Sequence, residues 1–277
     1  MISRRNFIGK TGIATSGFLI NPSHGFSFLQ NEFESKRPPV AERKFVSEAV
    51  EETIKRIKSQ IANPELAWLF ENCFPNTLDT TVNFDAKAAA KNHPDTYVIT
   101  SDIDVIRLRD SSAQIHPYLP LMKHDIKLRQ LVEGILLRQF ICIQRDPYAN
   151  AYYKDLNRVS EWKDIDQTEM RDGIHERKWE LDSLCYVLRL MHSYWKEVNY
   201  DLTFFRQHEQ EFKKTIRIIL QTLKDQRRYN GTGNEHEILI LFFISLFIYF
   251  AKKRERMLIN AKTFFFLSSN KLKFPPS

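Results

Sequence analysis

Glycine is almost absent from the middle of this chain, and this scarcity is the first constraint on its fold. Between residues 26 and 230 only Gly134 and Gly173 occur. The long segments around them have apolar residues that recur at intervals of three and four, which is the period of a helix and not of a strand. The sequence therefore predicts an all-α domain.

Five helices can be placed from this periodicity. Asn63 followed by Pro64 is a typical helix start, with Asn as the N-cap and Pro in the first helical position, and Asp125 can cap another helix. The expected helices cover residues 41–62, 63–73, 125–145, 176–198 and 202–226. Loops of about twenty to thirty residues separate some of these helices, and in a compact domain such loops usually carry function.

The basic charge of the chain lies at its two ends. The 41 Lys and Arg residues outnumber the 34 Asp and Glu residues, which gives a formal charge of +7, and 43% of all residues are hydrophobic. Residues 11–250 nevertheless carry a net charge of about −2, whereas phosphate recognition needs a basic face on the folded domain itself. The composition thus excludes a disordered chain, and we expect no nucleic-acid partner.

The first thirty residues resemble an export signal. Arg4 and Arg5 are followed by a mildly apolar stretch over residues 11–20, which is the layout of a twin-arginine signal. We therefore leave residues 1–30 out of the fold and expect export to the periplasm by the twin-arginine route. A chance arginine pair in a flexible terminus is the alternative.

The chain holds three cysteines, Cys73, Cys142 and Cys185. Proteins that use the twin-arginine route fold in the reducing cytoplasm before they cross the membrane, and an odd number of cysteines fits that route. We therefore expect no disulfide.

The segment over residues 100–114 is the richest in reactive groups. Within fifteen residues it holds three carboxylates, two guanidinium groups and four hydroxyls, which can present paired donors and acceptors to the vicinal hydroxyls of a sugar. Asp102 and Asp104 could instead begin a calcium loop, but no glycine and no later glutamate complete the ligand set. Arg109 and Asp110 could form only a salt bridge and a helix cap, and the sequence leaves that alternative open.

A second polar cluster lies at the expected start of the fourth helix. Glu176, Glu180 and Ser183 are spaced to share one face of that helix, and Trp179 and Asp182 share a neighbouring face. A carboxylate beside an aromatic ring is a common sugar-binding arrangement. An acidic first turn is also what the helix dipole favours, so a purely structural role stays open.

Four stretches of the chain together carry a family resemblance. They include Asn-Pro-Glu-Leu-Ala at 63–67 with Asn-Thr-Leu-Asp-Thr-Thr at 76–81, Leu-Arg-Asp-Ser-Ser at 108–112, Asp-Pro-Tyr-Ala-Asn-Ala at 146–151 and Trp-Glu-Leu-Asp at 179–182. In order and spacing, over residues 55–228, they resemble glycoside hydrolase family 125. The resemblance implies an (α/α)6 toroid and a metal-independent, inverting exo-α-1,6-mannosidase. It also implies a mannose-terminated glycan as substrate, and we expect no cofactor and a monomer.

The resemblance assigns roles to individual residues. Arg109 and Asp110 match the pair that clamps the non-reducing terminal sugar in such toroids, and bidentate bonds to adjacent hydroxyls explain the exo mode. Two positions depart from the family, since Arg107 stands where an aromatic residue is expected and Ser101 where glycine is usual. The wider substrate-binding set that the resemblance implies is Asp102, Ser111, Tyr148, Asn150, Glu176 and Trp179.

The catalytic pair of the family is not found. An inverting hydrolase needs a general acid and a general base roughly 6.5 to 9.5 Å apart. The resemblance places the acid in a Ser-Asp-Asp-Ala segment and the base in a His-Glu-Ser-Phe segment, both downstream of Asp182, and neither segment occurs here. We therefore expect that no catalytic residue is retained, and that Glu180 and Asp182 are the only nearby carboxylates that could substitute.

The amino-acid composition of the chain changes after Gly233. An apolar run over residues 238–251 is followed by a cluster of lysines and arginines, and a shifted reading frame or an unspliced insert explains this composition. A membrane anchor is the alternative, but fourteen residues fall short of the ~20 that span a bilayer, so we expect no membrane span. Residues 231–277 are thus expected to lie outside the family domain.

The family domain is expected over residues 41–230, as a partial (α/α)6 toroid truncated after roughly half of its helical hairpins.

Two hypotheses on function, from different classes, follow from the sequence. The first hypothesis is an α-mannosidase whose sequence is an incomplete copy of an active enzyme and is inactive as this chain. The alternative is a noncatalytic carbohydrate-binding or misfolded remnant.

Overall fold

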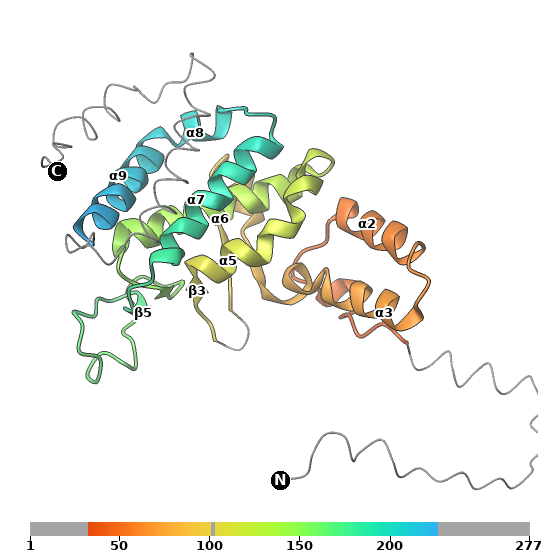
Figure 1. The fold of residues 1–277 in the computed structure, drawn as a ribbon, viewed down its shortest axis with the longest axis horizontal. Coiled ribbons are helices and arrows are strands. Elements are labelled where there is room, and N and C mark those ends of the chain that lie inside the picture. Colours follow the sequence, from red (N-terminus) through yellow and green to blue (C-terminus); the bar gives the residue numbers. More distant parts are fainter. Residues whose placement is uncertain (1–32, 101–102, 227–277) are drawn as a thin grey trace, which may run out of the picture.

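The computed structural model describes residues 33–100 and 103–226, and this part of the chain is mostly helical (Figure 1). The expected export signal at residues 1–30, the candidate ligand Asp102 and the tail at residues 231–277 lie outside the described residues. In chain order, the elements are η2 (Val40–Glu42), α2 (Glu48–Lys58), α3 (Pro64–Cys73), η3 (Thr77–Thr81), β1 (Val82–Phe84), α4 (Ala86–Ala89), β2 (Thr96–Val98), β3 (Ile106–Arg107), α5 (Leu108–Ile115), η4 (His116–Lys123), α6 (Ile126–Arg145), β4 (Ala151–Tyr152), β5 (Ile174–Glu176), α7 (Leu181–Glu197), α8 (Thr203–Gln207) and α9 (Glu209–Asp225).

Two of the helix starts are those expected from capping chemistry. The side chain of Asn63 accepts a hydrogen bond from the Leu66 amide with Pro64 in the first turn of α3, and Asp125 accepts one from the Leu128 amide at the start of α6. The helix expected over residues 41–62 is wrong at both ends, because Ser47 caps α2 and the helix ends at Lys58. Helical periodicity alone does not reveal such a cap.

Helix α6 is the centre of the core. Eleven of its twenty residues are buried, and it packs against α7, α9, η4 and β2, while α5 packs along α7 (Figure 1). The contact with β2 depends on Gly134, because a Cβ atom at that position would lie 2.5 Å from the Thr96 hydroxyl and 2.9 Å from the Asp95 backbone. One of the two glycines in this part of the chain thus permits close helix–strand packing.

The domain is not purely α-helical, because two small antiparallel sheets are present. Strands β1 and β2, which flank α4 in the sequence, form a two-stranded sheet, and β3, β4 and β5 form a three-stranded sheet in that spatial order. Arg107 lies opposite Ala151, and Ala151 lies opposite Glu176. This sheet therefore brings three segments that are distant in the sequence into one row.

The remaining helix predictions need correction where strands or breaks intervene. The helix expected over 176–198 begins only at Leu181, because residues 174–176 pair with β4 as strand β5. The helix expected over 202–226 is broken at His208 into α8 and α9. The segment expected as a loop over 100–114 is partly helical, since α5 begins at Leu108.

The described part of the chain shows no helix with both the length and the apolar character that crossing a bilayer requires. The three cysteines, Cys73, Cys142 and Cys185, are all free thiols.

Helices α2 and α3 lie at one end of the molecule, whereas β3, β5 and the start of α7 lie together at another part of it (Figure 1).

Candidate active site

The three-stranded sheet positions a polar network around Glu176. Because Arg107 and Glu176 flank Ala151 in the sheet, the Arg107 guanidinium reaches the Glu176 carboxylate at 2.9 Å. Asn150 is next to that row, and its amide donates to Glu176 at 3.2 Å and to Glu180 at 3.4 Å. Strand pairing thus positions Glu176, and the Asn150 amide connects Glu176 to Glu180.

A second cluster joins the starts of α5 and α7. The Arg109 Nε atom donates to Asp110 Oδ1 at 3.0 Å, and its Nη1 atom lies 3.2 Å from Asp182 Oδ2 and 3.8 Å from Glu180 Oε2. All four side chains are partly exposed. We call these residues the Arg109 cluster.

Charge pairing sets the electrostatics of both groups. Hydrogen bonds that Arg109 donates to Asp110 and then to Asp182 raise the pKa of Arg109 above its ordinary value, so the guanidinium stays charged. Burial alone would raise the pKa of Glu176, but the charge of Arg107, the Asn150 amide and Lys178 outweigh it, and the net pKa is lowered. Each group therefore holds one guanidinium, that of Arg107 or that of Arg109, against carboxylate oxygens.

Aromatic side chains lie beside these carboxylates. The rings of Tyr148 and Trp179 are 5.4 Å apart between centroids, and the guanidinium of Arg177 lies 5.4 Å from the Tyr148 centroid. Arg177 also binds the buried Asp146 at 2.7 Å, which fixes the turn that carries Tyr148 and Asn150. Charged acceptors and an aromatic surface are thus found on neighbouring segments.

Most of the residues singled out in the sequence come together here. Arg109, Asp110, Glu180 and Asp182 form one cluster and Asn150 and Glu176 the adjoining network, with Tyr148 and Trp179 beside them. The salt-bridge alternative for Arg109 and Asp110 is present, but Asp110 is not the cap, since Arg107 occupies the N-cap position of α5.

The helical-face argument for the second cluster was wrong. Glu176 belongs to β5, Trp179 lies between β5 and α7, and Glu180 is the N-cap residue of α7 without a side-chain capping bond. These residues meet through strand pairing and a short connection, and not by sharing one helical face.

Ser111 does not face this site. It is fully buried, its hydroxyl lies 3.3 Å from the Leu108 carbonyl, and it accepts a hydrogen bond from the Gln139 amide at 2.9 Å. A sugar ligand would need an exposed hydroxyl, so the structure places Ser111 in an interior polar contact between α5 and α6.

Sequence reasoning missed three partners in the site. Arg107 was noticed only as a departure from the family pattern, and its pairing with Glu176 sixty-nine positions away gives it a place in the network. Asp146 and Arg177 form a pair that spans 31 positions. Their opposite charges were visible in the sequence, but only the sheet shows which ones pair.

No group of three or more histidine, cysteine or acidic side chains within residues 33–100 and 103–226 is arranged to hold a metal ion.

The chain is similar in sequence to other proteins, one of which has a solved structure. The meiotically up-regulated gene 157 protein of Schizosaccharomyces pombe is 40% identical over 166 residues, which are 58% of this chain and 32% of that protein. A solved metal-independent α-mannosidase of Streptococcus pneumoniae, in a non-productive complex with α-1,6-mannobiose, is 34% identical with a TM-score of 0.56. That match covers 64% of this chain and 39% of the solved one, so this chain spans about a third of the relatives' length.

The profile of one family covers the whole site. It matches residues 63–243, which include the Arg109 cluster, the Glu176 network and both aromatic rings, and which extend thirteen residues beyond residue 230. The match spans well over half of the chain. The chain therefore belongs to glycoside hydrolase family 125, the metal-independent α-mannosidases.

Proposed function

We propose that this chain carries the sugar-binding part of an exo-acting α-mannosidase and binds terminal mannose at the Arg109 cluster. The observation behind this proposal is the geometry of Arg109, whose guanidinium is shared by carboxylates from the starts of α5 and α7. The partial exposure of these groups leaves their polar atoms accessible to a ligand.

Sugar recognition suits this arrangement chemically. Each sugar hydroxyl can donate one hydrogen bond and accept others, so adjacent hydroxyls match a site that mixes a guanidinium with carboxylates. The Arg109–Asp182 and Arg109–Glu180 contacts, at 3.2 and 3.8 Å, are longer than the best charge-assisted bonds. A hydroxyl inserted between these groups would replace weak contacts with two shorter ones.

The aromatic rings give the second part of a sugar site. Tyr148 and Trp179 present partly exposed apolar faces next to Glu180. A terminal sugar clamped by Arg109 and Asp110 would place its apolar face near these rings. A clamp on adjacent hydroxyls of the last sugar favours exo action, because it leaves no space for a further sugar beyond it.

We propose that the described residues bind without hydrolysing. A general acid must carry a proton at the operating pH. Glu176 has a lowered pKa, and the Arg109 guanidinium lies 3.8 Å from the Glu180 carboxyl and 3.2 Å from the Asp182 carboxyl. An inverting mechanism also needs a carboxylate pair separated by a water, and the family segments expected to supply that pair are absent from the sequence.

The proposed substrate is a mannose-terminated glycan with an α-1,6 linkage, hydrolysed by a complete enzyme of this family with inversion and without a metal. We also propose that the packed helices α5, α6, α7 and α9 belong to an (α/α)6 toroid. The support for the toroid is the partial match to the solved Streptococcus pneumoniae mannosidase and the helix-on-helix packing around α6.

Binding can be tested with Asp110→Ala. We expect calorimetric titration of the 277-residue chain with α-1,6-mannobiose to give weak, saturable binding, and the variant to lose it because Arg109 and the sugar hydroxyls lose a shared acceptor. Glu52→Ala on the exposed face of α2 is the matched control and should bind like the parent chain. Equal affinity of the parent chain and Asp110→Ala would contradict the proposal.

Export by the twin-arginine route is a separate proposal that rests on Arg4 and Arg5. Replacing both with lysine keeps the charge but removes the guanidinium pair, so a receptor that reads this pair should no longer export the chain. The measurement is the periplasmic fraction of the chain in cells with an intact twin-arginine system. Undiminished export of the double variant by that system would show the localisation to be wrong.

A further inference from the structure

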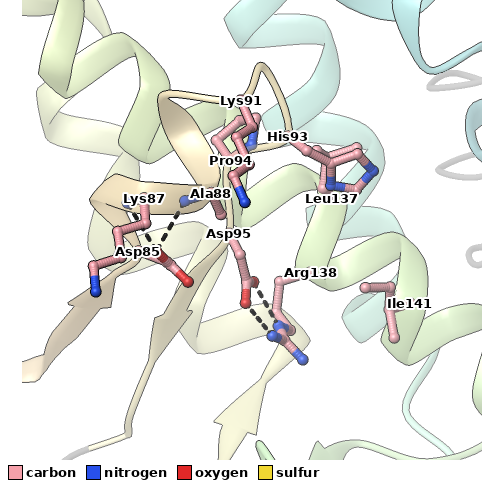
Figure 2. Close-up of a pocket in the computed structure, with 10 residues that line it drawn as sticks. All are labelled: Asp85, Lys87, Ala88, Lys91, His93, Pro94, Asp95, Leu137, Arg138 and Ile141. Carbon is pink, nitrogen blue, oxygen red and sulfur yellow. Dashed lines mark hydrogen bonds and ion pairs between the residues drawn. The ribbon is translucent and has the colours of Figure 1, made fainter.

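A pocket of about 390 Å³ lies between the segment around α4 and the middle of α6. It shares no lining residue with the Arg109 cluster or the Glu176 network. Figure 2 shows the Asp95–Arg138 pair in the middle, with Asp85, Lys87 and Ala88 on one side and Leu137 and Ile141 on the other. We call it the α4–α6 pocket.

Its acidic side chains are already engaged. The Asp95 carboxylate binds Arg138 through two bonds, one of them at 2.8 Å from the Arg138 Nε atom. Asp85 accepts hydrogen bonds from the Lys87 and Ala88 amides, both at 2.9 Å, as the cap of α4. The Asp95 carboxylate is therefore paired through both of its oxygens, whereas Asp85 uses only its Oδ1 atom as the cap.

Its basic side chains are less engaged. Among the described residues, the ammonium groups of Lys87 and Lys91 form no ion pair, and both side chains are exposed. Arg138 uses its Nε and Nη2 atoms for Asp95, which leaves the Nη1 donors. The pocket thus combines a fixed arginine with two lysines available to an anion.

The pocket also has an apolar side. Leu137 and Pro94 are buried in its wall and Ile141 is 39% exposed beside Arg138. Its volume lies in the lower part of the roughly 300 to 1,000 Å³ range typical of small-molecule sites, and it exceeds what a free phosphate ion fills. The ligand that fits has an anionic group and a small organic body.

We propose that the α4–α6 pocket binds a phosphomonoester of monosaccharide size, with Lys87, Lys91 and the free donors of Arg138 around the phosphate. The sugar-sized body lies along Ile141 and Pro94. The two sources of this chemistry are a sugar phosphate and free inorganic phosphate, and the pocket volume favours the sugar phosphate. This site is independent of mannose binding at the Arg109 cluster.

Titration of the full chain with glucose 6-phosphate, inorganic phosphate and glucose tests the proposal, because none of these probes is a mannoside. We expect saturable binding of glucose 6-phosphate that weakens by about tenfold or more in Lys87→Gln/Lys91→Gln, since each lysine contributes a charge-assisted bond. Lys55→Gln/Lys127→Gln removes the same charge from exposed positions elsewhere and should leave the affinity unchanged. Tighter binding of glucose 6-phosphate than of inorganic phosphate identifies a sugar phosphate as the ligand.

Several results would overturn the proposal. These are equal weakening in the two double variants, glucose binding as tightly as glucose 6-phosphate, or no saturable binding of either phosphate. A second readout does not depend on variants: the proton resonances of His93, which lines the pocket, should shift on saturation with glucose 6-phosphate in the parent chain. An unchanged His93 spectrum at saturation would also contradict the site.

Discussion

Two arginine–carboxylate groups in this molecule use the same chemistry in opposite surroundings. Near the start of the described chain, Arg37 binds Asp79 at 2.7 Å and Glu51 at 2.9 Å, and its side chain is 5% exposed. At the candidate site, Arg109 binds Asp110 and Asp182 at 3.0 and 3.2 Å, and its side chain is 38% exposed. Only the second group can exchange its partners for a ligand.

Burial separates the structural ion network around Arg37 from the network around Arg109 that we propose to bind a ligand. Arg37 donates to two carboxylates on different elements, so it fastens the segment before η2 to both α2 and η3. Removing one partner leaves a buried charge without compensation, which is costly. An exposed ion pair contributes little to stability, because water and salt screen it.

The largest expected effect is that of Asp79→Asn on stability. The substitution keeps the side-chain shape but removes a charge that is 2% exposed, and we expect the free energy of unfolding to fall by about 3 kcal/mol. Asp182→Asn is the matched control at the open cluster, where 49% exposure limits the loss to about 0.5 kcal/mol. Urea unfolding of both variants measures the difference, and equal losses would refute the contrast.

A smaller effect concerns pH. The hydrogen bond from Arg37 lowers the pKa of Glu51, burial opposes it, and the charges of Arg37 and Arg43 lower it further. A lowered folded-state pKa means that the stabilisation is present above the ordinary value of 4.5 and is lost as the pH falls through the folded value.

Glu51→Gln removes that titration. The variant should therefore be less stable than the parent chain at neutral pH. The gap should narrow as the pH falls below 4.5 and through the lowered folded-state pKa, because the parent carboxyl then becomes protonated. Urea unfolding at neutral pH and over a series of decreasing acidic pH values measures the gap. A gap that stays constant or widens in acid would show that Glu51 is not stabilised by its arginine partners.

The sequence predicts the local features of the fold better than the long-range ones. Asn63 and Asp125 were identified correctly as caps, because capping depends on groups three residues apart. The start of α7 was placed five residues too early, because the pairing of β5 with β4 competes with the helix and leaves no mark in helical periodicity. Local chemistry is readable from one sequence, whereas long-range pairing is not.

In the candidate site, too, contacts between sequence neighbours were predictable and long-range contacts were not. Arg109 and Asp110 are neighbours in the sequence, so their pairing could be anticipated, and the motif around them pointed to the family. The contacts of Arg107 with Glu176 and of Arg109 with Asp182 join positions 69 and 73 residues apart. The burial of Ser111 was also hidden, because the partner that buries it, Gln139, lies on another helix.

The proposal that the Arg109 cluster binds mannose without hydrolysing it is the central claim, and one assay tests it most directly. Purified 277-residue chain is incubated with α-1,6-mannobiose, and released mannose is measured beside Glu180→Gln and Asp182→Asn. We expect no mannose from any of the three, because the proposal assigns none of the described residues to protonate the leaving oxygen or to activate water. Release of mannose by the parent chain that either substitution abolishes would contradict the account and place a catalytic carboxyl at the start of α7.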